Sequence, residues 1–317
     1  RDSLISIKAD ARNKIDLQEL RTRIDELKAD NVAIIGMVGV AGTSETGSVD
    51  PLDEMADIAE EIGCHFHVDA AWGGPTLFSK KYAHILKGIE RADSVTIDAH
   101  KQMYVPMGAG MVVFKDPSLV SSIEHHADYI IRKGSRDLGA YTLEGSRPGI
   151  AMLLHSGLKI IGRSGYEILI EQGIEKAHAF ASMINAETDF ELVSEPELNI
   201  LTYRYVPAFV KQKLATATPA QVDEIHEVLN RLTKRIQKNQ RARGKSFVSR
   251  TTLTPEAWDR RRTIVFRVVL ANPLTSLEIL QDVLAEQKHI ASTSACTECM
   301  DELHGLCDDR PMHAHAV

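Results

Sequence analysis

Two stretches decide the fold of this chain: HFHVDAAWGG at residues 65–74 and SVTIDAHKQM at residues 94–103. Each opens with a short apolar run ending in aspartate, as expected for a strand inside a parallel sheet. Residues 80–91 between them predict a connecting helix, and GMVVF at 110–114 predicts another strand. Strands that alternate with helices predict an α/β fold with a mostly parallel sheet and right-handed crossovers.

The upstream segments continue this alternation. Residues 16–30 carry leucines and isoleucine at helical spacing, and VAIIGMV at 32–38 predicts a buried strand. After a Gly- and Thr-rich loop, Asp50 is a good N-cap and Pro51 suits the first helical position. We expect that helix to end at Gly63.

Functional residues of such sheets gather beyond the carboxyl ends of the strands. Asp69 closes one predicted strand, while Asp98, His100 and Lys101 follow the end of the next. The sequence therefore predicts a polar site at this edge of the sheet.

The pattern changes after about residue 190, where a smaller α+β domain is expected. Its predicted strands are FELVS, NILTYRYV and TIVFRVVL, and its predicted helices are residues 219–239 and 275–287. We place a large domain at 1–188, the small domain at 189–290 and a disordered tail at 291–317, where no apolar period is apparent.

Composition narrows the class of protein. The chain has 317 residues, 44% of them hydrophobic, and a formal net charge of −7, which argues against nucleic acid as a partner. No run of about 18 apolar residues predicts a membrane span. Four cysteines do not make a disulfide scaffold, so a reducing cytoplasm is expected. Because the first residue is not Met, we expect a piece of a longer chain.

Several motifs carry a resemblance to one family. They are HVDAAWGG (67–74), DAHKQM (98–103), TIVFRVVL (263–270), GVAGTSETGSVDPL (39–52), GIERADSV (88–95) and TLEGSRPG (142–149). Over roughly residues 4–290 the chain resembles the group II pyridoxal-phosphate-dependent amino-acid decarboxylases. The resemblance implies the aminotransferase-like fold (fold type I), pyridoxal 5′-phosphate as cofactor, and a missing N-terminal part.

The resemblance assigns the central chemistry to three residues. Lys101 would bond covalently to the cofactor aldehyde, Asp69 would keep the ring nitrogen protonated, and Ala71 would present a small methyl to the ring. A solvated surface lysine and a strand-end cap are the alternatives for Lys101 and Asp69.

Further cofactor contacts are implied at His100, Thr43 and Ser44, against the alternatives of a core histidine and an ordinary turn. Gly145 and Ser146 would approach the phosphate of a neighbouring subunit, or simply begin a helix. The first alternative implies a homodimer with active sites at its interface.

The substrate assignment rests on Arg267, which would bind a substrate carboxylate or else form an internal salt bridge. Tyr129 or Tyr141 would protonate the Cα atom, unless a His or Lys does so. We expect α-decarboxylation of an acidic amino acid, aspartate to β-alanine or glutamate to γ-aminobutyrate, with aspartate preferred. The alternatives are a diaminobutyrate or aromatic amino-acid decarboxylase, an aminotransferase or desulfurase, and a non-catalytic dimerising fragment.

The tail also holds a CxxC pair, Cys296 and Cys299, followed by His304 and Cys307. The remaining spacing matches no familiar zinc site, so we expect no metal.

Overall fold

The computed structural model describes residues 3–126, 129, 131–132, 134–142 and 147–308. The chain divides into two units, one of residues 1–10 and 14–172 and the other of residues 11–13 and 173–317. This division falls inside helix α4, whereas the sequence placed a domain boundary after residue 188. In the described part, no helix has the length and apolar character needed to cross a membrane.

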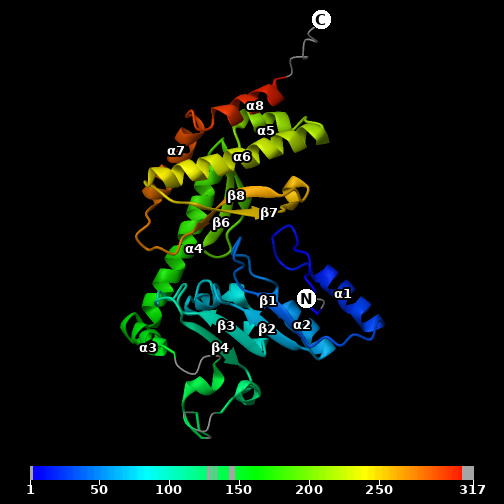
Figure 1. The fold of residues 1–317 in the computed structure, drawn as a ribbon, viewed down its shortest axis with the longest axis vertical. Coiled ribbons are helices and arrows are strands. Elements are labelled where there is room, and N and C mark those ends of the chain that lie inside the picture. The colour runs from blue at the N-terminus through cyan, green and yellow to red at the C-terminus, as the bar shows by residue number, and fades with distance from the viewer. Residues whose placement is uncertain (1–2, 127–128, 130, 133, 143–146, 309–317) are drawn as a thin grey trace, which may run out of the picture. The chain divides into compact units, whose positions relative to one another are not determined.

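The first unit is built on a four-stranded sheet in the order β1-β2-β3-β4, visible in Figure 1. The first three strands are parallel and β4 is antiparallel. The strands are β1 (Gly36–Val40), β2 (His65–Asp69), β3 (Ser94–Asp98) and β4 (Gly110–Phe114). The helices are α1 (Leu17–Ala29), α2 (Leu52–Ile62), η1 (Gly74–Phe78), η2 (Ala83–Leu86), η3 (Ile89–Arg91), η4 (Pro117–Ile123), η5 (Leu138–Tyr141), α3 (Ile150–Ile160) and α4 (Gly162–Ala186), the last extending into the second unit.

The two faces of this sheet differ in burial, as the side chains of β2 show. Phe66 and Val68 are 2% and 0% exposed, while the residues that alternate with them are half-buried. Helix α2 packs against the buried face. A Cβ atom added at Gly39 of β1 would lie only 3.0 Å from Leu52 and 3.2 Å from Met55, both of which are on α2. Polar residues of β2 consequently share the opposite face.

Asp50 has a different role from the helix cap that the sequence predicts. The N-cap of α2 is Pro51, and its first helical residue is Leu52. The Asp50 carboxylate instead accepts hydrogen bonds from the backbone N–H groups of Ile15 (2.7 Å) and Val40 (2.8 Å). Burial raises the pKa of Asp50, and these two bonds hold the carboxylate between distant segments. The predicted end of α2 at Gly63 is confirmed, with φ of 68°.

The helix predicted over residues 80–91 is wrong. Two short 3₁₀ helices, η2 and η3, occupy this segment and are separated by Lys87 and Gly88. Gly88 has φ of 96°, and a Cβ there would lie 2.4 Å from the backbone nitrogen of Asp53. A continuous helix is excluded because the chain must turn at Gly88 to pass close to α2.

The second unit contains a four-stranded antiparallel sheet in the order β5-β6-β8-β7. Its elements are β5 (Phe190–Ser194), β6 (Ile200–Tyr205), α5 (Ala208–Leu214), α6 (Pro219–Arg243), β7 (Ser249–Leu253), η6 (Glu256–Trp258), β8 (Thr263–Val269), α7 (Leu277–Ala291) and α8 (Thr297–Cys307). Helix α6 contacts β6, β7 and β8 as well as α7 and α8, so it lies between the sheet and these last helices (Figure 1).

The expectation of a disordered tail from residue 291 is wrong for the residues of helix α8. Cys296, Cys299 and Leu303 are at most 1% exposed and belong to the core of the second unit. Their spacing of three and four residues is an apolar helical period, once cysteine is treated as a small apolar side chain. Residues 309–317 lie outside the described part of the chain.

Candidate active site

The segments that follow β1, β2 and β3 meet at the carboxyl ends of the parallel strands. The Gly73 N–H donates to the carbonyl of Ala41 at 2.9 Å, and the Asp98 N–H donates to the carbonyl of Ala71 at 3.2 Å. These bonds connect residues that lie far apart in the sequence. They bring the turn after Asp69 beside the turn that carries Lys101.

Lys101 is held by an ion pair at this edge. Its Nζ lies 2.9 Å from Oδ2 of Asp98, and its backbone N–H donates to the Asp98 carbonyl at 3.1 Å. The Lys101 and Asp98 side chains are 35% and 17% exposed. The lysine is therefore not a freely solvated surface side chain. Asp98 belongs to the polar edge that the sequence predicts, and its i, i+3 spacing from Lys101 could have indicated this ion pair.

The turn beyond Lys101 is strained. The Tyr104 N–H donates to the Lys101 carbonyl at 3.2 Å, and Tyr104 has φ of 58°. A left-handed conformation costs a non-glycine residue about 1–2 kcal/mol. Such strain is concentrated at functional sites, which agrees with the position of this turn.

His100 is oriented by a single backbone carbonyl. Its backbone N–H and its Nδ1 lie 3.2 Å and 3.0 Å from the carbonyl oxygen of Ala109. A carbonyl can only accept, so Nδ1 carries a proton and donates it. The other nitrogen, Nε2, then faces Asp98 at 3.7 Å. Asp98 is thus the shared neighbour of His100 and Lys101.

Asp69 closes β2, as the sequence predicts. One of its carboxylate oxygens, Oδ1, accepts a hydrogen bond from the Ala71 N–H at 3.1 Å. Within the described residues this is the one hydrogen bond made by the carboxylate, so its second oxygen can accept another. The bond also places Ala71 directly beside Asp69.

A hydrogen-bonded cluster on the same sheet face was missed by the sequence analysis. His65 Nε2 and His67 Nδ1 lie 2.8 Å and 2.7 Å from the Ser94 hydroxyl, and Thr96 lies 3.3 Å from His67 Nε2. Burial lowers the pKa of His67, and the nearby charge of Asp69 opposes this effect. The period of two linking His65, His67 and Asp69 could have revealed their shared face.

The loop after β1 uses its own hydroxyl groups. Thr43 Oγ1 lies 2.8 Å from Thr46 Oγ1 and accepts a hydrogen bond from the Ser48 N–H at 3.1 Å. Ser44 is exposed. The Thr43 hydroxyl therefore stabilises the loop, and cofactor contacts by Thr43 and Ser44 stay predictions.

The two candidate proton donors differ in exposure: Tyr129 is 83% exposed and Tyr141 37%. Across the described residues, no hydrogen bond or ion pair joins either tyrosine to Lys101 or Asp69. The choice between the two tyrosines stays a prediction.

Arg267 lies on β8 in the second unit, half-buried and paired in register with Thr202 and Ser249. Its predicted contact with substrate is untested by this geometry. Gly145 and Ser146 lie outside the described residues.

Known proteins resemble this chain over most of its length. Residues 2–206 match the pyridoxal-dependent decarboxylase conserved domain. Aspartate 1-decarboxylase of Aliivibrio fischeri is 64% identical over 293 residues, which are 92% of this chain and 54% of that protein. L-2,4-diaminobutyrate decarboxylase of Rhizobium meliloti is 30% identical over 65% of this chain and 43% of that protein.

Among solved structures, mouse CSAD in its apo form matches with a TM-score of 0.81 and 26% identity, covering 91% of this chain and 59% of that one. The expected fold type I is thereby confirmed. The chain spans about half the length of the curated relatives it matches. On the domain match and these similarities, the chain belongs to the pyridoxal-dependent decarboxylase family.

Proposed function

We propose that this protein removes the α-carboxylate of an acidic L-amino acid, with aspartate as the preferred substrate and β-alanine as the product. The 64% identity to a protein named aspartate 1-decarboxylase carries this proposal. Glutamate decarboxylation is the nearest alternative. The more distant relatives named for diaminobutyrate and aromatic amino acids keep those substrates in the test panel.

Family membership implies pyridoxal phosphate as the cofactor, and the residues at the carboxyl edge of the sheet fit it. Asp69 has a carboxylate oxygen available to a protonated ring nitrogen, and Lys101 supplies a primary amine. When bound, pyridoxal phosphate supplies a conjugated ring that accepts the electron pair left by departing carbon dioxide.

Asp98 would position the amine of Lys101. An ammonium group is not nucleophilic, so Lys101 Nζ must lose a proton before it can attack a carbonyl carbon. The Asp98 carboxylate, 2.9 Å away, anchors the ammonium form at the edge of the sheet. His100 Nε2 lies 3.7 Å from Asp98 Oδ2 and would complete the polar surroundings of this carboxylate.

Asp69 would act by charge. A carboxylate beside a ring nitrogen favours the protonated ring, because an opposite charge within about 4–6 Å stabilises the charged form. The Ala71 N–H fixes the direction of the Asp69 carboxylate. The short side chain of Ala71 leaves space beside it.

Arg267 would recognise the second carboxylate of an acidic substrate by its planar, two-pronged guanidinium. Tyr129 or Tyr141 would return a proton to Cα. We further propose a cytoplasmic homodimer. Free thiols at all four cysteines support a reducing compartment, and α3, which has no buried residue, offers apolar surface for a partner subunit.

The reaction is tested by measuring carbon dioxide released by the full-length protein, with pyridoxal phosphate, from aspartate, glutamate, 2,4-diaminobutyrate and aromatic amino acids. We expect release chiefly from aspartate. Arg267→Ala should lower kcat/KM for aspartate by tenfold or more, since a hydrogen bond to a charged group contributes about 1.5–3 kcal/mol. The exposed Arg250→Ala on the neighbouring strand should change it little.

Attachment of the cofactor has a separate readout. Borohydride reduction followed by peptide mapping should label Lys101 in the wild-type protein. Lys101→Ala should abolish the label, and Lys80→Ala, which changes an exposed lysine, should not. A label on another lysine would contradict the site, whereas a label on Lys101 without carbon dioxide release would contradict the reaction.

A further inference from the structure

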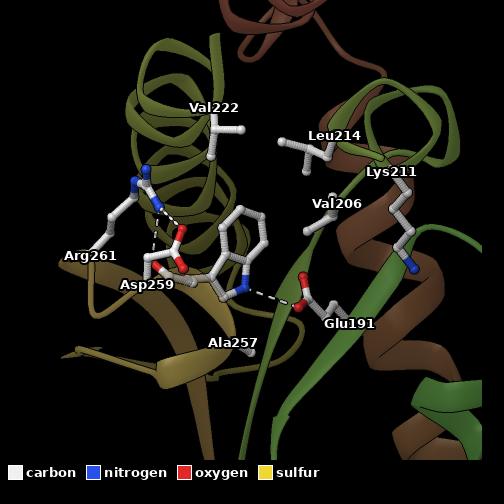
Figure 2. Close-up of a pocket in the computed structure, with 9 residues that line it drawn as sticks. Glu191, Val206, Lys211, Leu214, Val222, Ala257, Asp259 and Arg261 are labelled. Atoms are coloured by element: carbon white, nitrogen blue, oxygen red, sulfur yellow. Dashed lines mark hydrogen bonds and ion pairs between the residues drawn. The ribbon is translucent and has the colours of Figure 1, made fainter. Parts of the chain in front are cut away.

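The second unit contains a cavity of about 480 Å³ beside Trp258, drawn in Figure 2. This volume lies within the range of about 300–1,000 Å³ typical of small-molecule sites. Val206, Leu214 and Val222 form an apolar wall. Charged side chains complete the lining: in Figure 2, Glu191 and Lys211 lie on one side and Asp259 and Arg261 on the other.

Glu191 is the anion in this cavity that lacks a cation at bonding distance. Its carboxylate accepts a hydrogen bond from Trp258 Nε1 at 3.0 Å, its one hydrogen bond among the described residues. Burial raises the pKa of Glu191, which the Trp258 bond, Arg204 and Lys211 oppose in part. The Lys211 amine donates instead to the backbone carbonyl of Phe190. The carboxylate is therefore poorly neutralised.

The other charges at the cavity are already matched. Arg261 bonds to Asp223 and Asp259, each at 2.6 Å. Of the two carboxylates that line the cavity, Asp259 is thus paired, and Glu191 is the one without an ion pair in the described part of the chain. A ligand ammonium group would supply that partner.

The Trp258 side of the cavity is rigid. Trp258 is 7% exposed, and the Arg204 guanidinium lies over its ring at 5.1 Å from the centroid. Arg204 is itself fully buried and donates to the His226 carbonyl (3.1 Å) and to Asn230 Oδ1 (3.0 Å). An indole fixed from behind, which also orients Glu191, is a preorganised wall for an apolar ligand body.

We propose that this cavity binds a small primary amine with an aliphatic body, whose ammonium group pairs with Glu191 and whose carbon chain packs against Val206, Leu214 and Val222. A ligand carboxylate would lie near the Glu191 and Asp259 carboxylates, so amines are preferred over the corresponding amino acids. This site is built from the second unit alone. Its test is independent of the proposed decarboxylation.

The probe is isopentylamine, titrated into the full 317-residue chain and followed by the indole N–H resonance of Trp258 in ¹H–¹⁵N NMR spectra. The chain has two tryptophans, and Trp72→Phe identifies the signal. We expect saturable binding that shifts the Trp258 resonance, because that N–H donates to Glu191. Isopentanol, which lacks the charge, and leucine, which adds a carboxylate, should each bind at least tenfold more weakly.

Glu191→Gln should weaken isopentylamine binding at least tenfold, whereas the exposed Glu195→Gln should leave it unchanged. Ala257→Leu, at an exposed position of the lining, provides a second variant that narrows the cavity and should also weaken binding. The proposal is overturned if isopentylamine does not bind saturably, if isopentanol or leucine binds as tightly, or if Ala257→Leu and Glu191→Gln both retain wild-type affinity.

Discussion

His226 should make the stability of the second unit depend on pH. Its Nδ1 lies 3.3 Å from Arg204 Nη1, and its Nε2 lies 3.3 Å from the Arg262 carbonyl oxygen. A guanidinium only donates, so Nδ1 must accept and the ring proton stays on Nε2. Burial, and then the positive charge of Arg204, lower the pKa of His226 from 6.5 to about 4.

Proton uptake by His226 on unfolding sets the direction of this pH dependence. Between the two pKa values the unfolded chain binds the proton and the folded one does not, so acid favours unfolding. The stability tied to neutral His226 is present above pH 6.5 and lost progressively as the pH falls towards 4. One pKa unit corresponds to about 1.4 kcal/mol, so the shift at His226 can change the free energy of unfolding by at most about 3 kcal/mol. Solvent screening reduces this to about 2 kcal/mol.

The assay is urea unfolding of wild type and His226→Gln between pH 7 and pH 4.5, followed by tryptophan fluorescence. The free energy of unfolding of wild type should fall by about 2 kcal/mol more than that of the variant over this range. His289→Gln, an exposed change on α7, should follow wild type. A difference between wild type and His226→Gln that does not vary with pH would refute the reasoning.

Two further substitutions test the packing. Gly88→Ala should lower the free energy of unfolding by about 2 kcal/mol or more, because Gly88 has φ of 96° and the added Cβ would lie 2.4 Å from backbone. Gly63→Ala is the control, with φ of 68° and open space around the Cβ, and should cost about 1 kcal/mol. Equal costs for the two variants would contradict the role of the close approach at Gly88. Leu303→Ala should cost about 2–4 kcal/mol in denaturant unfolding, since Leu303 is fully buried. A loss no larger than that of the half-buried Leu306→Ala would argue against the docking of α8.

The strands were the most predictable part of the fold. Alternation of apolar and polar residues and short apolar runs are local features of a sequence. They predicted four strands with the observed bounds: β2 from HFHVD, β3 from SVTID, β4 from GMVVF and β5 from FELVS. Strand β7, SRTTL, was missed because few of its residues are apolar and its pairing with β8 supplies its stability. Helix α8 was missed because its apolar period is apparent only when Cys296 and Cys299 are counted as apolar residues.

Sequence alone predicted the parallel sheet and its polar edge, because these follow from local periodicity, and the resemblance of contiguous motifs to one family predicted roles for Lys101 and Asp69. Only the tertiary structure decided what those residues touch: the Asp98 carboxylate beside Lys101, the Ala71 N–H on Asp69, and the two histidines sharing the Ser94 hydroxyl. The Trp258 cavity likewise has walls contributed by β5, α5, α6 and η6. Such contacts depend on how distant segments pack, and packing is a property of the folded chain as a whole.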